Sequence, residues 1–227
     1  VATSAVREAG NGGEFIQRIF DEVGLRVSVI PGREEARLIH LGVAQVEDLD
    51  GPPSLILDIG GGSVEVVLVE DGRPTELHSL KLGVSRMSER FLQADPPRAK
   101  DVARLEEFLS EALEPALALA AKRKVKRVIG TSGTLLTLIS MAAHRLGVRP
   151  GAQVHGLEVP AEAITHLARV LARADREERL AMRGIDPKRV ELITAGAVLT
   201  DVVLGRLKSP RIRACTWALR EGLVQDF

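Results

Sequence analysis

The chain of 227 residues contains no tyrosine, and aromatic side chains make up only 3% of it. Its core must therefore be built from aliphatic side chains. A single cysteine, Cys215, excludes an internal disulfide and is typical of a reducing cytoplasm. No apolar run approaches the roughly 18 residues that span a bilayer, and the first ten residues lack signal-peptide character. These absences argue against disulfide-stapled and membrane proteins and favour a cytoplasmic location.

The chain also has no net charge, with 31 Lys and Arg against 31 Asp and Glu. This balance argues against a general binder of nucleic acid or anionic membranes, although it allows a local basic patch. The five histidines are scattered, without the spacing of a zinc site. We interpret them as structural or surface residues, and Cys215 as a core residue. With 45% hydrophobic and 27% charged residues, the composition is that of an ordinary globular protein.

Strand-like and helix-like segments alternate along the chain, which favours an α/β fold. The strands are expected at 26–31, 55–59, 64–70, 75–83, before 130 and at 210–215. The helices are expected at 12–23, 33–44, 101–121, 135–146, 161–174, 175–183, 191–205 and 217–225. Pro115 lies within the periodic segment 101–121 and should kink or split that helix. The segment 48–54, "DLDGPPS", is the best candidate for a linker.

The stretch "DIGGGSVE" joins two of the expected strands. Asp58 ends the first strand, Glu65 begins the second, and the loop between them contains Gly60, Gly61, Gly62 and Ser63. Glycine N–H groups can approach an anion closely, and the two carboxylates could hold Mg²⁺. A glycine-rich hairpin with both carboxylates in solvent explains this stretch equally well. The stretch matches neither the dinucleotide-binding nor the P-loop pattern.

A second glycine loop, "GTSGT", follows another expected strand and opens a helix. It consists of Gly130, Thr131, Ser132, Gly133 and Thr134. A helix N-terminus with free N–H groups favours an anion, although an ordinary N-cap would use the same residue types. Two such loops in one chain are more informative than one.

Two further segments carry candidate residues. Glu34 and Glu35 lie in the first turn of an expected helix, where the helix dipole alone favours acidic residues. Neighbours on a helix point about 100° apart, so at most one of them can face a cleft as a general base for water. In "ATSAVREA", Arg7 could clamp a phosphate, but taken alone this segment is better explained as a surface helix.

These motifs, in this order, resemble the exopolyphosphatase/guanosine pentaphosphate phosphohydrolase (Ppx/GppA) family of the actin–sugar kinase–Hsp70 superfamily. The resemblance spans nearly the whole chain. It rests on "ATSAVREA", "VIPGREEARLIHLGV", "LILDIGGGSVEVVL", "LKLGVSRMSERF", "VIGTSGT" and "TWALREGLV". The implied fold is an actin/Hsp70-type, ribonuclease H-like α/β domain, a mixed sheet flanked by helices, with the remnant of a second, similar domain.

The resemblance also implies roles for individual residues. Glu35 matches the water-activating base, and Asp58 and Glu65 match the metal-associated carboxylates. Arg7 and Arg86 match basic residues of the polyphosphate cleft. The phosphate loops match at Gly60–Ser63 and at Gly130–Thr134. The implied activity is the Mg²⁺-dependent release of terminal phosphate from linear polyphosphate.

Other activities stay open at this point. The 5′-phosphohydrolysis of pppGpp is an alternative, because both substrates present a terminal phosphoanhydride. A kinase of the same superfamily is less favoured, since no acceptor pocket can be identified. A phosphate- or nucleotide-binding domain without turnover is a third alternative. The expected partners are polyphosphate or (p)ppGpp, with a homodimer among the expected assemblies and no membrane or specific nucleic acid.

The sequence departs from the family at its start. The family's opening strand and loop, D-x-G-S-N-S, has no counterpart here, and the chain does not begin with Met. The expectation is therefore that about 80 residues or more, the size of a small domain, precede this sequence in a complete member. On this interpretation residues 1–44 are the remnant of a first domain, 45–216 form the second, and 217–227 form a helix that packs back towards the first.

Overall fold

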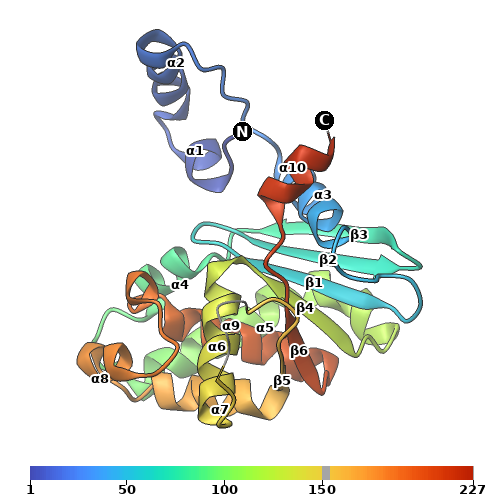
Figure 1. Ribbon diagram of the computed structural model, residues 1–227. Helices are drawn as coiled ribbons and strands as arrows, with labels where there is room; N and C mark the ends of the chain where they lie inside the picture. Colours follow the sequence, from blue (N-terminus) through green and yellow to red (C-terminus); the bar gives the residue numbers. More distant parts are fainter. Residues whose placement is uncertain (150–153, 227) are drawn as a thin grey trace.

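The computed structural model describes residues 1–149 and 154–226. Its helices and strands follow one another in the order shown in Figure 1. They are α1 (Ser4–Glu8), α2 (Gly12–Val23), α3 (Gly32–Val43), β1 (Ser54–Ile59), β2 (Val64–Glu70), β3 (Arg73–Leu80), α4 (Val84–Phe91), α5 (Ala99–Lys122), β4 (Arg127–Thr131), α6 (Ser132–Arg145), β5 (Glu158–Pro160), α7 (Ala161–Leu171), α8 (Arg176–Ala181), the 3₁₀ helix η1 (Pro187–Arg189), α9 (Ile193–Leu207), β6 (Arg211–Ala214) and α10 (Leu219–Asp226).

The strands form one mixed sheet in the order β3-β2-β1-β4-β6-β5. Strands β1, β2 and β3 make an antiparallel meander, whereas β4 runs parallel to β1 and to β6. The meander follows from the short turns after β1 and β2. The parallel strands need long helical connections, which α5 and α6 to α9 provide. The expected mixed α/β sheet flanked by helices is confirmed.

Alternation along the strands divides the core between the two faces of the sheet. On one face Leu55, Leu57 and Ile59 pack against the helices α4, α5, α6, α7 and α9, in the larger of two hydrophobic clusters. On the other face Ile56 and Val67 pack against α3 and the start of α10. Figure 1 shows these two layers on opposite sides of the sheet. The second face is the one that carries the candidate site.

Most of the expected elements are confirmed to within a few residues, including α2, α3, the meander, and the helices from α5 onwards. The strand expected at 26–31 is wrong, because this segment makes only an isolated bridge between Ala2 and Val29. Pro115 was expected to kink or split its helix; the split is wrong, since α5 runs through Pro115, and the kink stays a prediction. Pro115 lies on the exposed side of α5, where the carbonyl of Glu111 that it leaves unpaired can face water.

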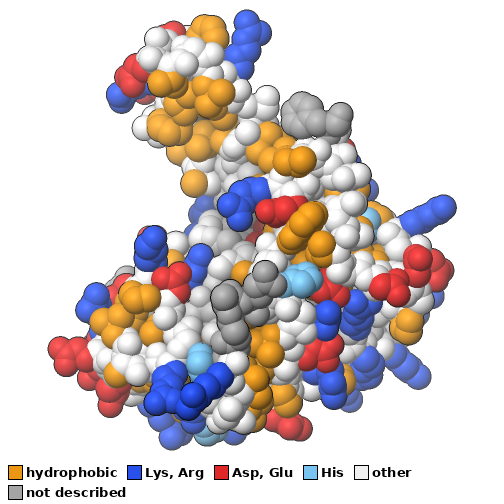
Figure 2. Space-filling model, in the orientation of Figure 1, with side chains coloured by type: hydrophobic (Ala, Val, Ile, Leu, Met, Phe, Trp, Pro, Cys, Tyr) orange, Lys and Arg blue, Asp and Glu red, His pale blue; other side chains and the backbone are white. Residues whose placement is uncertain are grey.

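The two N-terminal helices differ in how closely they approach the rest of the molecule. In Figure 1, α2 extends away from the sheet while α1 lies closer to it. The side chains of Phe15, Phe20 and Val23 on α2 are 42–71% exposed, and Figure 2 shows hydrophobic side chains gathered on this part of the surface. At the other end of the chain, α10 packs on α3. Within the described residues, no helix has the length and apolar character needed to cross a membrane.

Candidate functional site

Four polar side chains form a row across the second face of the sheet. The strand register pairs Asp58 of β1 with Glu65 of β2, then Glu65 with Ser79 of β3, and Asp58 with Thr131 of β4. Ser79 Oγ donates a hydrogen bond to Glu65 Oε1 at 2.7 Å, and Thr131 Oγ1 donates one to Asp58 Oδ2 at 2.5 Å. Each carboxylate is thus held by a hydroxyl from the neighbouring strand.

The two carboxylates of this row are almost completely buried, at 8% exposed for Asp58 and 2% for Glu65. Burial raises the pKa of Asp58 to about 6, although the hydrogen bond from Thr131 works in the opposite direction and the charge of Glu35 adds to the rise. Burial, followed by the charges of Glu35 and Asp58, raises the pKa of Glu65 to about 8. Ionisation of both carboxyl groups is therefore unfavourable unless a cation is bound near them.

A third carboxylate, Glu35, comes from the first turn of α3. It is 7% exposed, and Arg7 Nη1 lies 3.2 Å from its Oε2. The same Arg7 nitrogen donates to the carbonyl of Ile30 at 2.8 Å, which fixes the guanidinium beside Glu35. Glu34 faces elsewhere, because Arg37 binds both of its carboxylate oxygens and also contacts Asp226 of α10. Of the two neighbouring glutamates, only Glu35 points to the polar row.

The charges of this site fit a hard cation. Three carboxylates influence one another here, and Arg7 is the one residue that forms an ion pair with any of them in the described parts of the chain. Oxygen donors of this kind suit Mg²⁺, which usually keeps several of its own waters. The oxygens of Glu35, Asp58 and Glu65 do not all lie within 4.8 Å of one another, as judged over the residues that the structure describes. They fit a cation held partly through water.

The first glycine loop, Gly60–Ser63, joins β1 to β2 directly beside the row, and its carbonyls and N–H groups are used differently. The carbonyls of Gly60, Gly61 and Gly62 accept hydrogen bonds from the backbone of residues 83–85 at the start of α4. Of the N–H groups in the loop, Gly60 donates to the carbonyl of Ser63. No hydrogen bond from the N–H of Gly61, Gly62 or Ser63 is found in residues 1–149 and 154–226. These three donors are available for an anion.

Close packing behind the loop requires glycine. A Cβ on Gly83 would overlap the carbonyl of Gly61, and a Cβ on Gly62 would lie 2.5 Å from Ser4 Oγ. The guanidinium of Arg86 is engaged within the protein. Its Nε donates to the carbonyl of Gly62 at 2.9 Å, and its Nη2 donates to Glu8 at 2.7 Å. Arg86 therefore holds the loop from its carbonyl side.

The second glycine loop joins a strand to the start of a helix, as expected, and its side chains are engaged within the protein. Gly130 and Thr131 belong to strand β4, and α6 already begins at Ser132. Thr131 is fully buried against Asp58. Ser132 has a φ of +69° and bridges to the end of β1, donating to the carbonyl of Ile59 at 2.8 Å and accepting from its N–H at 3.3 Å. Such a conformation is costly for serine, and this bridge ties the second loop to the first.

Gly133 completes the second loop and is covered by Arg189. A Cβ at Gly133 would overlap the guanidinium of Arg189, which is otherwise paired with Asp186 at 3.3 Å. Arg189 comes from the 3₁₀ helix η1 and was not among the residues expected from the sequence. A single arginine in a "DPKR" segment has no distinctive spacing, so only the fold brings it to the N-terminus of α6.

A polar groove of about 370 Å³ extends from the site along β3. Its walls include Ser63 and Ser79, which belong to the loop and the row, and the basic residues Arg7, Arg33 and Lys81. One acidic residue, Glu8, lies among them; burial opposes its ionisation, but hydrogen bonds from Lys81 and Ser4 keep the pKa of this carboxyl below its usual range. Arg33 and Lys81 were also missed by the sequence analysis, because the groove forms between segments far apart in the chain.

A separate group, Glu47, His155 and Cys215, brings three possible ligand atoms within 4.8 Å of one another. Arg127 and Arg213 bind the carboxylate of Glu47. The N–H of Thr216 donates to Nδ1 of His155 at 3.3 Å, and burial raises the pKa of the Cys215 thiol to about 11. With two guanidinium groups on its carboxylate, this group is an internal hydrogen-bonded network.

Comparison with known proteins places these features in a family. The sequence profile of the Ppx/GppA phosphatase family matches residues 1–227. "Exopolyphosphatase 1" of Mycobacterium leprae is 33% identical over 226 residues, which cover 98% of this chain and 66% of that protein. "Guanosine-5'-triphosphate,3'-diphosphate pyrophosphatase" of Photobacterium profundum is 28% identical and is covered over 44% of its length. The chain thus spans about two thirds or less of these relatives.

A solved structure agrees with the sequence comparison. The crystal structure of an exopolyphosphatase from Cytophaga hutchinsonii superimposes with a TM-score of 0.89 at 31% identity, over 98% of this chain and 72% of that one. The mixed sheet and its helical layers therefore have the fold of that exopolyphosphatase. The chain is a member of the Ppx/GppA phosphatase family.

Proposed function

We propose that this protein is a phosphohydrolase that releases terminal phosphate from linear inorganic polyphosphate. The observation that carries the proposal is the pairing of two buried carboxylates, Asp58 and Glu65, with a loop in which the N–H groups of Gly61, Gly62 and Ser63 have no partner among the described residues. The carboxylates suit a cation and the loop suits an anion. A phosphoanhydride neutralised by Mg²⁺ supplies both together.

In the proposed reaction Glu35 acts as the general base. It removes a proton from a water that attacks the terminal phosphorus in line with the bridging oxygen. The new bond joins the water oxygen to phosphorus, the bond to the bridging oxygen breaks, and the shortened polyphosphate departs with that oxygen. Arg7 orients Glu35 and lowers the repulsion that an incoming phosphate meets. The free N–H groups of the first loop bind the oxygens of the transferred phosphoryl group.

A bound Mg²⁺ would offset the charge that develops on the phosphoryl oxygens. Asp58 and Glu65 would hold it, directly or through water. Their raised pKa values mean that its binding displaces protons from this row. Thr131 and Ser79 keep the two carboxylates in the row across the sheet, so that the donor oxygens face the loop.

The remaining length of a polyphosphate fits the groove beside the site. Arg7, Arg33 and Lys81 line it, and they can neutralise the phosphates that follow the terminal one. A chain of repeating phosphates suits a row of spaced cations better than a nucleoside does. This is the reason to place polyphosphate before pppGpp.

The hydrolysis of pppGpp at its 5′ end is the second candidate. It is favoured by the relative from Photobacterium profundum, although the identity to it is lower than to the mycobacterial exopolyphosphatase. The use of Mg²⁺, a cytoplasmic location, a homodimer and the division of the chain at residues 44 and 216 stay predictions of the sequence.

The experiment is to measure phosphate release from long-chain polyphosphate and from pppGpp, with and without Mg²⁺, by the 227-residue chain and its Glu35→Gln variant. We expect Mg²⁺-dependent release from polyphosphate that the variant lacks. Release from pppGpp alone would favour the second candidate. If the chain binds polyphosphate but releases no more phosphate than the variant does, the fold serves binding without turnover and the proposal is wrong.

A further inference from the structure

The carboxylate of Glu8, at the end of α1, is held by three donors from separate parts of the chain. Ser4 Oγ donates to its Oε1 at 2.9 Å, Arg86 Nη2 donates to its Oε2 at 2.7 Å, and Lys81 Nζ lies 3.1 Å from that same Oε2. A hydroxyl, a guanidinium and an ammonium group are donors that proteins also use to bind a phosphate. Glu8 therefore fills a position that is built like a small anion site.

This position lies at the polar groove, beside the first glycine loop. Glu8 and Lys81 both line the groove. The other two donors contact the loop, since Arg86 Nε donates to the carbonyl of Gly62 and a Cβ on Gly62 would lie 2.5 Å from Ser4 Oγ. The carboxylate of Glu8 is thus close to the loop that, in the proposed function, binds the transferred phosphoryl group.

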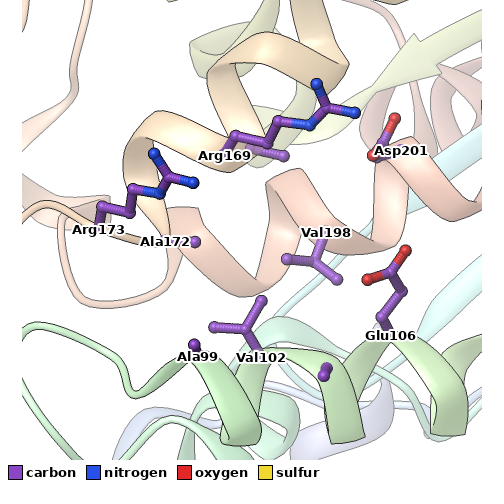
Figure 3. A pocket seen from close by; sticks show the side chains of 10 residues that line it. Ala99, Val102, Glu106, Arg169, Ala172, Arg173, Val198 and Asp201 are labelled. Carbon is purple, nitrogen blue, oxygen red and sulfur yellow. The ribbon is translucent and has the colours of Figure 1, made fainter.

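Another hollow of the surface shows that lining a hollow together with cations does not by itself produce ion pairs. It has a volume of about 360 Å³ and lies between α5, α7 and α9, and Figure 3 shows the side chains that line it. Glu106 of α5 lines this hollow together with Arg169 and Arg173, yet Glu106 forms no ion pair within residues 1–149 and 154–226. In the polar groove, by contrast, Glu8 forms ion pairs with two cations.

Of the two cations, Lys81 is the one that a ligand can take over. Its side chain is 74% exposed, and ion pairs of exposed lysines contribute little to stability. Arg86 also holds the carbonyl of Gly62, so it should stay with the loop. A condensed phosphate presents several charged oxygens at once, which makes it a stronger partner for Lys81 than one carboxylate.

We propose that Glu8 competes with the substrate for Lys81 and thereby sets how tightly the groove binds condensed phosphates. In the free protein the carboxylate of Glu8 pairs with Lys81. In the bound state a phosphate of the chain pairs with Lys81 instead, and the ion pair to Glu8 is broken. Glu8 lowers the affinity, because binding must break this pair and bring a phosphate near a carboxylate. The inference rests on the proposed function, which places a phosphate chain in this groove.

The test measures binding without turnover, in the 227-residue chain with Glu35→Gln. Isothermal titration calorimetry would give the Kd of long-chain polyphosphate at one fixed Mg²⁺ concentration, with and without the further substitution Glu8→Gln. We expect Glu8→Gln to lower this Kd at least about fivefold, or about 1 kcal/mol. If Glu8 served only to hold α1 in place, its loss would leave the affinity unchanged or weaken it.

Two comparisons sharpen this test. Glu106→Gln is the matched control, because it removes one negative charge from the hollow of Figure 3, and it should leave the Kd within about twofold. In a Lys81→Gln background Glu8 has no lysine to mask, so Glu8→Gln should there lower the Kd by less than about twofold. Circular dichroism would show that each variant is folded, and Glu8→Ala serves as a second variant with the same expected gain.

Several results would overturn the proposal. They are an unchanged or higher Kd in the folded Glu8 variants, an equal gain in Glu106→Gln, the full gain in the Lys81→Gln background, or no binding of polyphosphate by any variant. The proposed hydrolysis fails by a different result. If Glu8→Gln tightens binding but the chain with its native Glu35 releases no phosphate, the competition stands and the hydrolysis is wrong.

Discussion

The two glycine loops are similar in composition but differ in the contacts that their residues make. In the first loop, Gly60–Ser63, three N–H groups have no partner in the part of the chain that the structure describes, and the carbonyls of Gly60, Gly61 and Gly62 are held by the start of α4. In the second, Gly130–Gly133, the residues are used within the protein: Thr131 binds Asp58, Ser132 bridges to β1, and Arg189 covers Gly133. In the proposed function the first loop therefore binds the phosphate, while the second supports Asp58 from behind.

The largest expected effect concerns the base that serves the first loop. Glu35→Gln should lower kcat by about 10²–10⁴-fold, since it removes general-base catalysis, with little change in KM. Glu34→Gln is the matched control and should change kcat by less than about threefold, because Arg37 holds Glu34 away from the site. Phosphate release would be measured for both variants. Equal losses of kcat would mean that Glu35 is not the one glutamate of α3 that faces the site.

The loops themselves can be compared with one added methyl group in each. Gly62→Ala places a Cβ against Ser4 and should shift the first loop. A displacement of this kind can lower a rate by about 10²-fold. We expect kcat/KM to fall by at least about tenfold. In Gly133→Ala the new atom meets only the end of the flexible Arg189 side chain, which can move. Activity within about threefold of wild type is expected there. A larger loss of activity in Gly133→Ala than in Gly62→Ala would indicate that the second loop, and not the first, binds the phosphate.

The supporting role of the second loop can be tested at Thr131. Thr131→Val keeps the shape of the side chain but removes the donor to the buried Asp58. Leaving such a group unsatisfied should lower the free energy of unfolding by about 1–3 kcal/mol, measured by urea denaturation at pH 7.5 without Mg²⁺. Added Mg²⁺ should recover part of this loss, because the cation gives the carboxylate another partner. A variant as stable as wild type would contradict the supporting role.

The smallest effect is the dependence of stability on pH and Mg²⁺. The pKa values of Asp58 and Glu65 rise from 3.8 and 4.5 to about 6 and about 8 in the folded chain. The folded state therefore holds protons that the unfolded state has released. Without a cation, the contribution of these groups to stability is greatest below pH 4. It should decrease as the pH rises through about 4 to 8.

Added Mg²⁺ should offset that decrease. Consider one Mg²⁺ concentration, equal to ten times the Kd at pH 8. It should raise the free energy of unfolding by about 1.4 kcal/mol at pH 8 and by much less at pH 5, where protons compete for the carboxylates. Thermal unfolding scans at both pH values, with Asp58→Asn/Glu65→Gln as the control, would measure the difference. Stabilisation that is equal at the two pH values, or that persists in the control, would show that the cation binds elsewhere.

Much of the architecture follows from sequence patterns. Alternation in "LILDI" and "VEVVLVE" predicts strands whose even or odd positions share a face, and this alternation is what places Asp58 and Glu65 together. The helical periodicity of 101–121 predicts α5 in spite of Pro115. The segment 26–31 also alternates, but no neighbouring strand pairs along it, so it forms only a bridge.

The site was less predictable than the fold. The family resemblance selects Glu35, Asp58 and Glu65. The reason why Glu34 faces elsewhere appears only in the structure, where Arg37 binds the Glu34 carboxylate and also contacts Asp226, 189 residues further along the chain. The use of Thr131 and Ser132 within the protein depends on strand register. Arg33, Lys81 and Arg189 reach the site through tertiary packing, for which local sequence carries no signal.

The central claim is that the first loop, and not the second, is the part that binds phosphate. The most direct test is to follow the backbone amides of the ¹⁵N-labelled chain by NMR while Mg²⁺ and pyrophosphate are added. The N–H signals of Gly61, Gly62 and Ser63 should shift, whereas those of Gly130 and Thr131 should stay nearly unchanged. Shifts confined to the second loop, with the first unaffected, would contradict this account.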